Sequence, residues 1–150
     1  MTIASTILDQ IVDGTGEPPP MVTTLKLPPI EGWEPGRVWG TWTVDPAFFH
    51  AMGAVFGGYL AALADSFVSL AMFSTMPDDE VFTTADLRVS FFRPVSVGTL
   101  TIVAEVLHRG KRMAHVEAVF VDQKDKIAVK ATATKIITPL VDPELSGSGG

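Results

Sequence analysis

The longest apolar stretch of the chain runs from Val55 to Phe73 and carries a single charge, Asp65, near its middle. Its composition, with few β-branched residues, predicts a helix from about 57 to 75. The stretch is long enough to cross a bilayer, but a central Asp costs about 2.5–3.5 kcal/mol on insertion scales. No Lys or Arg flanks it closely. We therefore expect a helix that is buried on all sides within a soluble protein.

Strand-like alternation of apolar and polar positions surrounds this helix. One such segment precedes it and leads through Asp45-Pro46 into a short helical turn at 46–51. Four follow it, so the five expected strands cover 37–44, 83–92, 100–107, 113–121 and 127–137. Short turns make the last strands antiparallel neighbours. The order predicts an α+β fold, an antiparallel five- to six-stranded sheet packed on the helix. A single sheet covers only part of such a helix, which indicates an oligomer.

The strand at 83–92 alternates with a period of two residues. Because successive side chains of a strand point to opposite faces, its residues divide into two sets. We expect Ala85, Leu87, Val89 and Phe91 on one face and Thr84, Asp86, Arg88 and Ser90 on the other.

The chain divides by composition into three parts. Residues 1–36 combine a short helical pattern with a Pro-rich loop and are expected to be a peripheral extension. Residues 37–140 form the predicted domain, and 141–150 are a Ser/Gly-rich flexible tail.

Composition narrows the classes of function. A chain of 150 residues fits one domain, and 47% hydrophobic with 19% charged residues exclude a disordered protein. There is no Cys, and the three His residues lack the spacing of a metal site, so we expect no metal. A net charge of −6 argues against a nucleic-acid partner. The N-terminus lacks the basic start of a secretory signal, so we expect a cytoplasmic protein with no membrane partner.

Asp65 and the pair Gly57-Gly58 are the first candidates for chemistry. A carboxylate in an apolar helix can be a nucleophile or general base with a perturbed pKa, or a structural group bonded to a neighbouring element. Glycines at the helix start allow close approach to free N–H groups, which suit an anion or oxyanion, or they form a tight turn. Together the two features point to a reaction at a carbonyl.

Several polar residues could assist. His50 precedes the helix, and Thr83 and Thr84 begin the next strand. The hydroxyl of a Thr could orient a carboxylate or a water molecule, although Thr is also ordinary in strands. A basic cluster around Gly110 suits phosphates or is a solvated hairpin tip; its members are Arg109, Lys111 and Arg112.

The stretch 55–65, Val-Phe-Gly-Gly-Tyr-Leu-Ala-Ala-Leu-Ala-Asp, resembles the His-Gly-Gly…Leu-x-Asp signature of hot-dog-fold acyl-CoA thioesterases of the phenylacetate-pathway type. The stretch 86–94 resembles that family's strand ending in Arg-Pro. The stretches 106–112 and 128–134 resemble its hairpin and its last strand. The resemblance covers about 37–138.

The resemblance implies a sheet wrapped around a central helix and a homodimer with a continuous sheet, or a dimer-of-dimers tetramer. It also implies hydrolysis of acyl-CoA or aryl-acyl-CoA thioesters, which needs no cofactor. By position, Asp65 matches the catalytic carboxylate and Gly57 the residue whose N–H polarises the carbonyl. Thr84, with Thr83 as the second choice, matches a hydroxyl near the carboxylate. His50 falls where relatives often carry Asn, near the attacking water.

One position departs from the family pattern, because Phe56 replaces the signature His. We expect Phe56 and Gly58 beside the substrate, and Arg109, Lys111 and Arg112 against the CoA phosphates. Two alternatives stay open: a hot-dog protein that binds acyl-CoA without turning it over, and a structural oligomeric scaffold.

Overall fold

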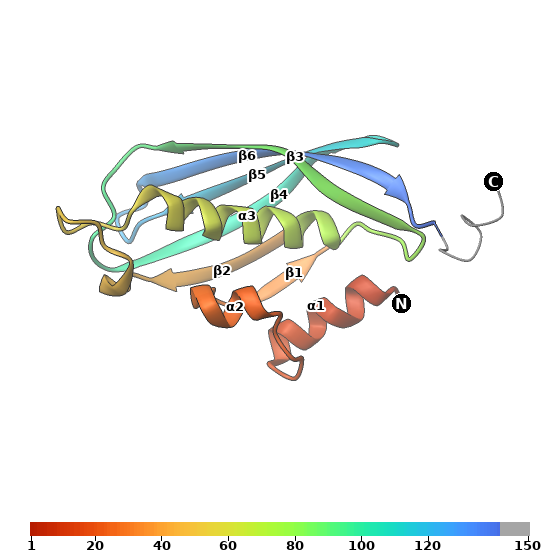
Figure 1. Ribbon diagram of the computed structural model, residues 1–150, viewed down its shortest axis with the longest axis horizontal. Coiled ribbons are helices and arrows are strands. Elements are labelled where there is room, and N and C mark those ends of the chain that lie inside the picture. Colours follow the sequence, from red (N-terminus) through yellow and green to blue (C-terminus); the bar gives the residue numbers. More distant parts are fainter. Residues whose placement is uncertain (142–150) are drawn as a thin grey trace, which may run out of the picture.

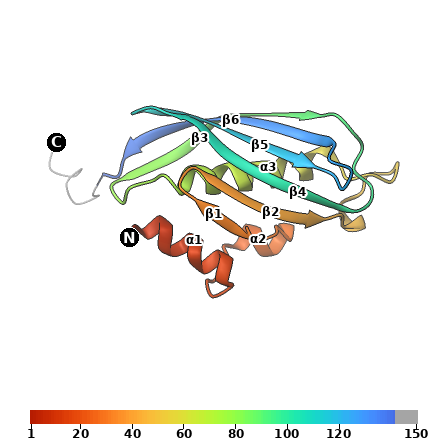
Figure 2. The ribbon, with the colours of Figure 1, turned by 180° about the vertical axis from the view of Figure 1, so that it is seen from behind.

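A curved antiparallel sheet of six strands holds one long helix, α3 (Gly57–Phe73), in the computed structural model, which describes residues 1–141 (Figure 1). The strand order is β1-β2-β4-β5-β6-β3. The strands are β1 (Gly32–Glu34), β2 (Arg37–Thr43), β3 (Glu80–Phe91), β4 (Thr99–Arg109), β5 (Met113–Val121) and β6 (Ile127–Pro139). The predicted α+β architecture is confirmed. Figure 2, from behind, shows the sheet curving past α3 from β3 to β1.

Only one side of α3 is buried. Its sheet-facing residues recur with helical spacing and pack into the core: Tyr59, Leu60, Leu63, Ala64, Phe67, Val68, Ala71 and Met72. On the other side Asp65 is exposed, with the partly exposed Ser66 and Ser69 beside it. Within one chain the single sheet reaches only one side of the helix, so the expected burial on all sides is not reached there, and cover of the other side by an oligomer stays a prediction. No helix within residues 1–141 is long and apolar enough to cross a membrane.

Strand β3 is a long edge strand with a bulge. The register shifts between Thr84, which pairs with Lys135, and Asp86. Beyond the bulge Leu87 pairs with Ala133. Lys135 and Ala133 are two residues apart and both buried, so Thr84 and Leu87 share the face toward α3. The prediction that these two side chains lie on opposite faces is wrong, because one extra residue reverses the alternation.

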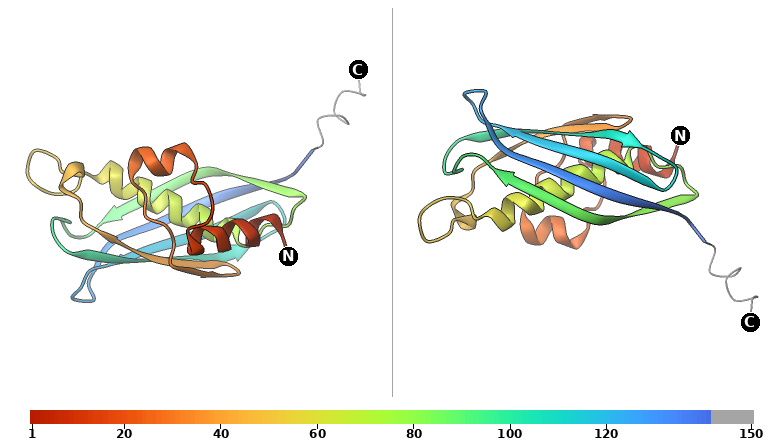
Figure 3. Two further views of the ribbon diagram at one scale, coloured as in Figure 1. Left: turned by 90° about the horizontal axis from the view of Figure 1, so that it is seen from below. Right: turned by 90° about the horizontal axis from the view of Figure 1, so that it is seen from above.

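The first 31 residues form two helices, α1 (Ile3–Asp13) and α2 (Pro20–Leu25), of which only α1 has a predicted counterpart. Both lie on the side of α3 away from β5 and β6 (Figure 3). This N-terminal segment is less peripheral than expected, because Leu8 and Ile30 are fully buried in the core. The hydroxyl of Tyr59 on α3 also donates to the carbonyl oxygen of Leu25 at 2.9 Å.

The remaining predictions concern boundaries. The short turn before α3 is the 3-10 helix η1 (Pro46–Phe48), with the carboxylate of Asp45 accepting from the N–H of Ala47. The division into an extension, a domain and a tail stays a prediction. Apart from Val141, the predicted tail at 141–150 lies outside the described residues.

Candidate active site

The uncovered side of α3 forms the floor of a cavity of about 780 Å³. Asp65, Ser66 and Ser69 place polar groups on this floor. The walls come from the N-terminal segment and are mainly apolar, including Ile7, Ile11, Met21, Val22, Leu25 and Leu27. A mostly apolar cavity of this size with a few polar groups is typical of a small-molecule site. The sequence pattern does not predict these walls, because a Pro-rich stretch is typical of a peripheral loop.

The start of α3 presents bare backbone N–H groups. No side chain caps the helix, and the N–H groups of Gly57 and Gly58 have no acceptor within residues 1–141. A Cβ on Gly57 would lie 3.0 Å from Cζ of Phe91, and one on Gly58 would lie 2.7 Å from Cε2 of Phe56. Both aromatic rings are about half exposed. The two glycines thus leave room for the rings while their N–H groups, at the positive end of the helix dipole, can bind an oxyanion.

A fully buried lysine lies between α3 and β3. The Nζ of Lys135 donates to the hydroxyl oxygen of Thr84 at 2.7 Å and to that of Ser69 at 3.0 Å. Burial lowers the pKa of Lys135, and the negative charge of Asp65 opposes this shift. The sequence pattern did not predict a role for this residue. A signal for its burial is present in the sequence, because the alternation of β6 places a lysine at an inward position between Ala133 and Ile137.

The structure separates the two threonine candidates. Thr84 is joined to α3 through Lys135, whereas the neighbouring Thr83 points to the opposite face of β3. His50 lies on an exposed turn before α3, and its Nδ1 accepts the N–H of Met52 at 3.0 Å. No three His, Asp or Glu side chains in the part of the chain that the structure describes are close enough to hold a metal ion.

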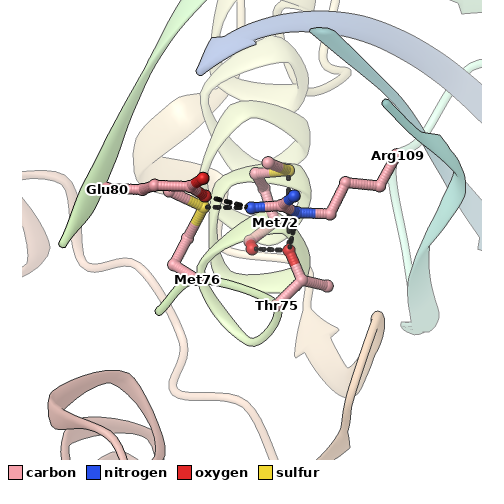
Figure 4. A network of polar contacts seen from close by, with 5 residues as sticks. All are labelled: Met72, Thr75, Met76, Glu80 and Arg109. Atoms are coloured by element: carbon pink, nitrogen blue, oxygen red, sulfur yellow. Dashed lines mark hydrogen bonds and ion pairs between the residues drawn. The ribbon is translucent and has the colours of Figure 1, made fainter. Parts of the chain in front are cut away.

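The basic cluster divides into one bound and two exposed side chains. The guanidinium of Arg109 pairs with the carboxylate of Glu80, and its Nε donates to the hydroxyl of Thr75 at 3.2 Å (Figure 4). Lys111 and Arg112 are exposed. This hairpin lies at the C-terminal end of α3, about 25 Å from Gly57 for a helix of this length.

Comparison with known proteins assigns the family. The sequence model of the thioesterase superfamily matches residues 52–129. The chain belongs to the thioesterase superfamily. The match spans the turn after η1, all of α3, the strands β3, β4 and β5 and the first residues of β6.

Solved structures with a similar fold include two proteins related to phenylacetic acid degradation. A phenylacetic acid degradation-related protein from Ralstonia eutropha JMP134 is 27% identical, with 86% of this chain and 98% of that one covered and a TM-score of 0.75. The PaaI protein of the E. coli phenylacetic acid degradation operon is 24% identical, with 89% and 94% covered and a TM-score of 0.74. In sequence, PM0788 of Pasteurella multocida, provisionally named an esterase, is 28% identical over 101 residues, which are 66% of this chain and 73% of that protein.

These matches confirm the predicted resemblance to hot-dog thioesterases and the predicted hot-dog fold. Membership of the superfamily supports hydrolysis of an acyl thioester as the class of reaction.

Proposed function

We propose that this protein hydrolyses an acyl-CoA or aryl-acyl-CoA thioester to the free acid and CoA, with Asp65 as the catalytic carboxylate. The observation that carries the proposal is the position of Asp65 on the floor of an apolar cavity of about 780 Å³. The apolar walls suit the acyl or aryl group, and the carboxylate lies where the thioester carbon would enter.

Two alternative mechanisms fit this arrangement, and both give the same products. As a general base, Asp65 takes a proton from a water molecule whose oxygen adds to the thioester carbon. As a nucleophile, Asp65 adds to that carbon itself and forms an anhydride, which water then hydrolyses. In either case the carbonyl oxygen becomes negative and accepts the N–H of Gly57, and the C–S bond breaks to release CoA as its thiolate, which takes up a proton.

One subunit cannot supply both groups. Gly57 and Asp65 are eight residues apart on α3, which is about 12 Å along the axis. The attacking atom must come within about 3–3.5 Å of the thioester carbon. The same carbonyl oxygen must accept the N–H at about 2.7–3.1 Å. We therefore place Gly57 of one subunit opposite Asp65 of a second subunit across a two-fold axis, which gives two equivalent sites.

The sheet offers an edge for such a dimer. At the edge opposite the three-residue β1 lies β3, which has 12 residues and an unpaired row of backbone groups. Pairing of two β3 edges would place the uncovered sides of two α3 helices next to one another, antiparallel. Lys111 and Arg112 of one subunit would then lie at the same end as Gly57 of the partner, where they can contact CoA phosphates.

The substitution Asp65→Asn tests the proposal. It changes one oxygen to NH₂ and removes the base, so kcat for thiol release from acyl-CoAs should fall about 10²- to 10⁴-fold. Asp125→Asn is the matched control, since Asp125 is exposed on the β5–β6 turn with φ of 58°, a conformation that Asn tolerates. Near-normal turnover by the Asp65 variant would assign Asp65 a structural role and refute the mechanism.

Phe56 favours one alternative, binding of acyl-CoA without turnover. An apolar, half-exposed ring replaces the family's polar His beside Gly58. Thermal stabilisation of the protein by acyl-CoAs without any release of thiol would support this binding function and exclude the enzyme.

A further inference from the structure

Lys135 is the one buried polar or charged residue within residues 1–141. Its ammonium lies 5.4 Å from the ring centroid of Phe82 and has no carboxylate within ion-pair distance in this part of the chain. A buried charge without a direct counter-ion is costly for the fold. Such an arrangement is more frequent at functional sites than elsewhere.

The hydrogen bonds of Lys135 determine in which direction the hydroxyl groups of Thr84 and Ser69 can donate. An ammonium has three donors and no acceptor, so the hydroxyl oxygens of Thr84 and Ser69 must accept from it. Their own O–H protons are then directed away from Lys135. Both hydroxyls therefore become donors toward the remaining space around them, which suits a carboxylate or an attacking water.

This cluster lies at Asp65. Ser69 follows Asp65 by one helical turn on the same side of α3, and both residues line the same cavity. Thr84 lies on the face of β3 toward α3 and joins the cluster through the ammonium of Lys135. The charge of Asp65 acts on the ammonium, since it opposes the lowering of the pKa of Lys135.

We propose that Lys135 is a positioning residue of the thioester-hydrolysing site: its ammonium holds the hydroxyls of Thr84 and Ser69 as donors toward Asp65 and the attacking water. The inference rests on the proposed function and adds a group that acts through its neighbours. Because it orients the reacting groups without touching the substrate, its loss lowers kcat and leaves KM nearly unchanged.

Two substitutions test Lys135 directly. Lys135→Met keeps the stem and removes the charge, and Lys135→Gln keeps a polar end that can also accept a hydrogen bond. Misplacement of reacting groups by about 1 Å costs up to about 10²-fold, so we expect kcat of each variant to fall roughly 10- to 100-fold, with KM within about twofold. The control is Lys130→Met on the same strand, because Lys130 is exposed and pairs with Glu117 at 2.8 Å.

A double-mutant cycle distinguishes positioning from stability. If Lys135 acts through Thr84, the variant with both Lys135→Met and Thr84→Val should be no slower than the slower single variant. Additive losses, an unchanged kcat in a folded Lys135 variant, or failure of both Lys135 variants to fold would each overturn the proposal. Loss of turnover in Asp65→Asn together with normal turnover in Lys135→Met would reject this inference alone. Absence of thiol release by the unaltered protein would reject the proposed function itself.

Discussion

Asp65 is a candidate catalytic residue because of the groups around it and not because of its own burial. The carboxylate is exposed within one chain, so the desolvation expected from an apolar helix is absent there. Its surroundings are nevertheless specific, since Ser69 lines the same apolar cavity and its hydroxyl accepts from the buried ammonium of Lys135, which also donates to Thr84. Covering of this side by a partner subunit and a substrate would exclude water and strengthen each of these interactions.

The sequence around Arg109 suggests binding of phosphate, whereas its contacts support a structural role. Its guanidinium pairs with Glu80 and donates to Thr75, which links β4 to β3 and to the turn after α3. Both side chains of the ion pair are less than a third exposed. Contact of Arg109 with a CoA phosphate stays a prediction.

We expect Arg109→Ala to lower the free energy of unfolding by about 1.5–3 kcal/mol, the range for hydrogen bonds to charged groups. Chemical denaturation measures the change. Arg37→Ala is the control, because Arg37 and Glu34 form an exposed pair at 3.7 Å that should contribute only about 0–1 kcal/mol. Equal effects of the two substitutions would contradict the structural role of Arg109.

At the scale of elements, the hydrophobic pattern predicted most of the sheet and its helix. Strands with strong alternation and the apolar run of α3 were found within a few residues of their observed bounds. The bulge at Ala85 was not predicted, because Ala85 continues the apolar set of Leu87 and Val89, so the sequence shows no break at the extra residue. Helix α2 and strand β1 were missed because Pro20 at a helix start and three paired residues carry little local signal. Lys135 was not predicted, because a single charge within a strand pattern does not by itself indicate a buried position.

The β4–β5 hairpin contains the two residues that we expect to contact the phosphates of CoA. Lys111 and Arg112 are exposed, so their positive charges are accessible to the phosphates of a bound CoA. Joint replacement of both by Ala should raise KM for acyl-CoAs and weaken its dependence on salt, with kcat nearly unchanged. Activity on a short thioester without the nucleotide should hardly change.

The β5–β6 hairpin supplies the control for this experiment. Lys124 and Lys126 are also exposed, so their joint replacement by Ala removes the same number of positive charges elsewhere. If the two double variants raise KM equally, only the overall charge of the protein matters, and a specific phosphate contact is wrong.

At the scale of the whole molecule, the proposed site and the uncovered side of α3 both call for a second subunit. The uncovered side of α3 adjoins the open edge of β3, and Gly57 and Asp65 are too far apart to act on one thioester. A two-fold dimer with antiparallel α3 helices would cover the exposed side of α3. It would also place each Gly57 opposite an Asp65 of the partner subunit. Whether two such dimers form the tetramer that the family resemblance also allows stays a prediction.

Two variants make this arrangement testable. Gly57→Pro removes the N–H at the first helical position, where Pro is tolerated, and Phe56 before it already has the extended backbone that precedes Pro (φ −69°, ψ 145°). Gly57→Ala is its matched control, because it adds a Cβ against Phe91 but keeps the N–H. We expect the Ala variant to retain turnover and the Pro variant to lose it.

Mixing of inactive subunits tests the central claim most directly. Asp65→Asn and Gly57→Pro homodimers are each expected to be nearly inactive. After an equal mixture is unfolded and refolded, about half of the dimers should contain one subunit of each kind. Each mixed dimer then holds one intact site, so thiol release from acyl-CoA should return to about a quarter of the unaltered protein's rate. A mixture that stays inactive, with mixed dimers confirmed by differently tagged subunits, would contradict a site shared between Asp65 and the Gly57 of a partner subunit.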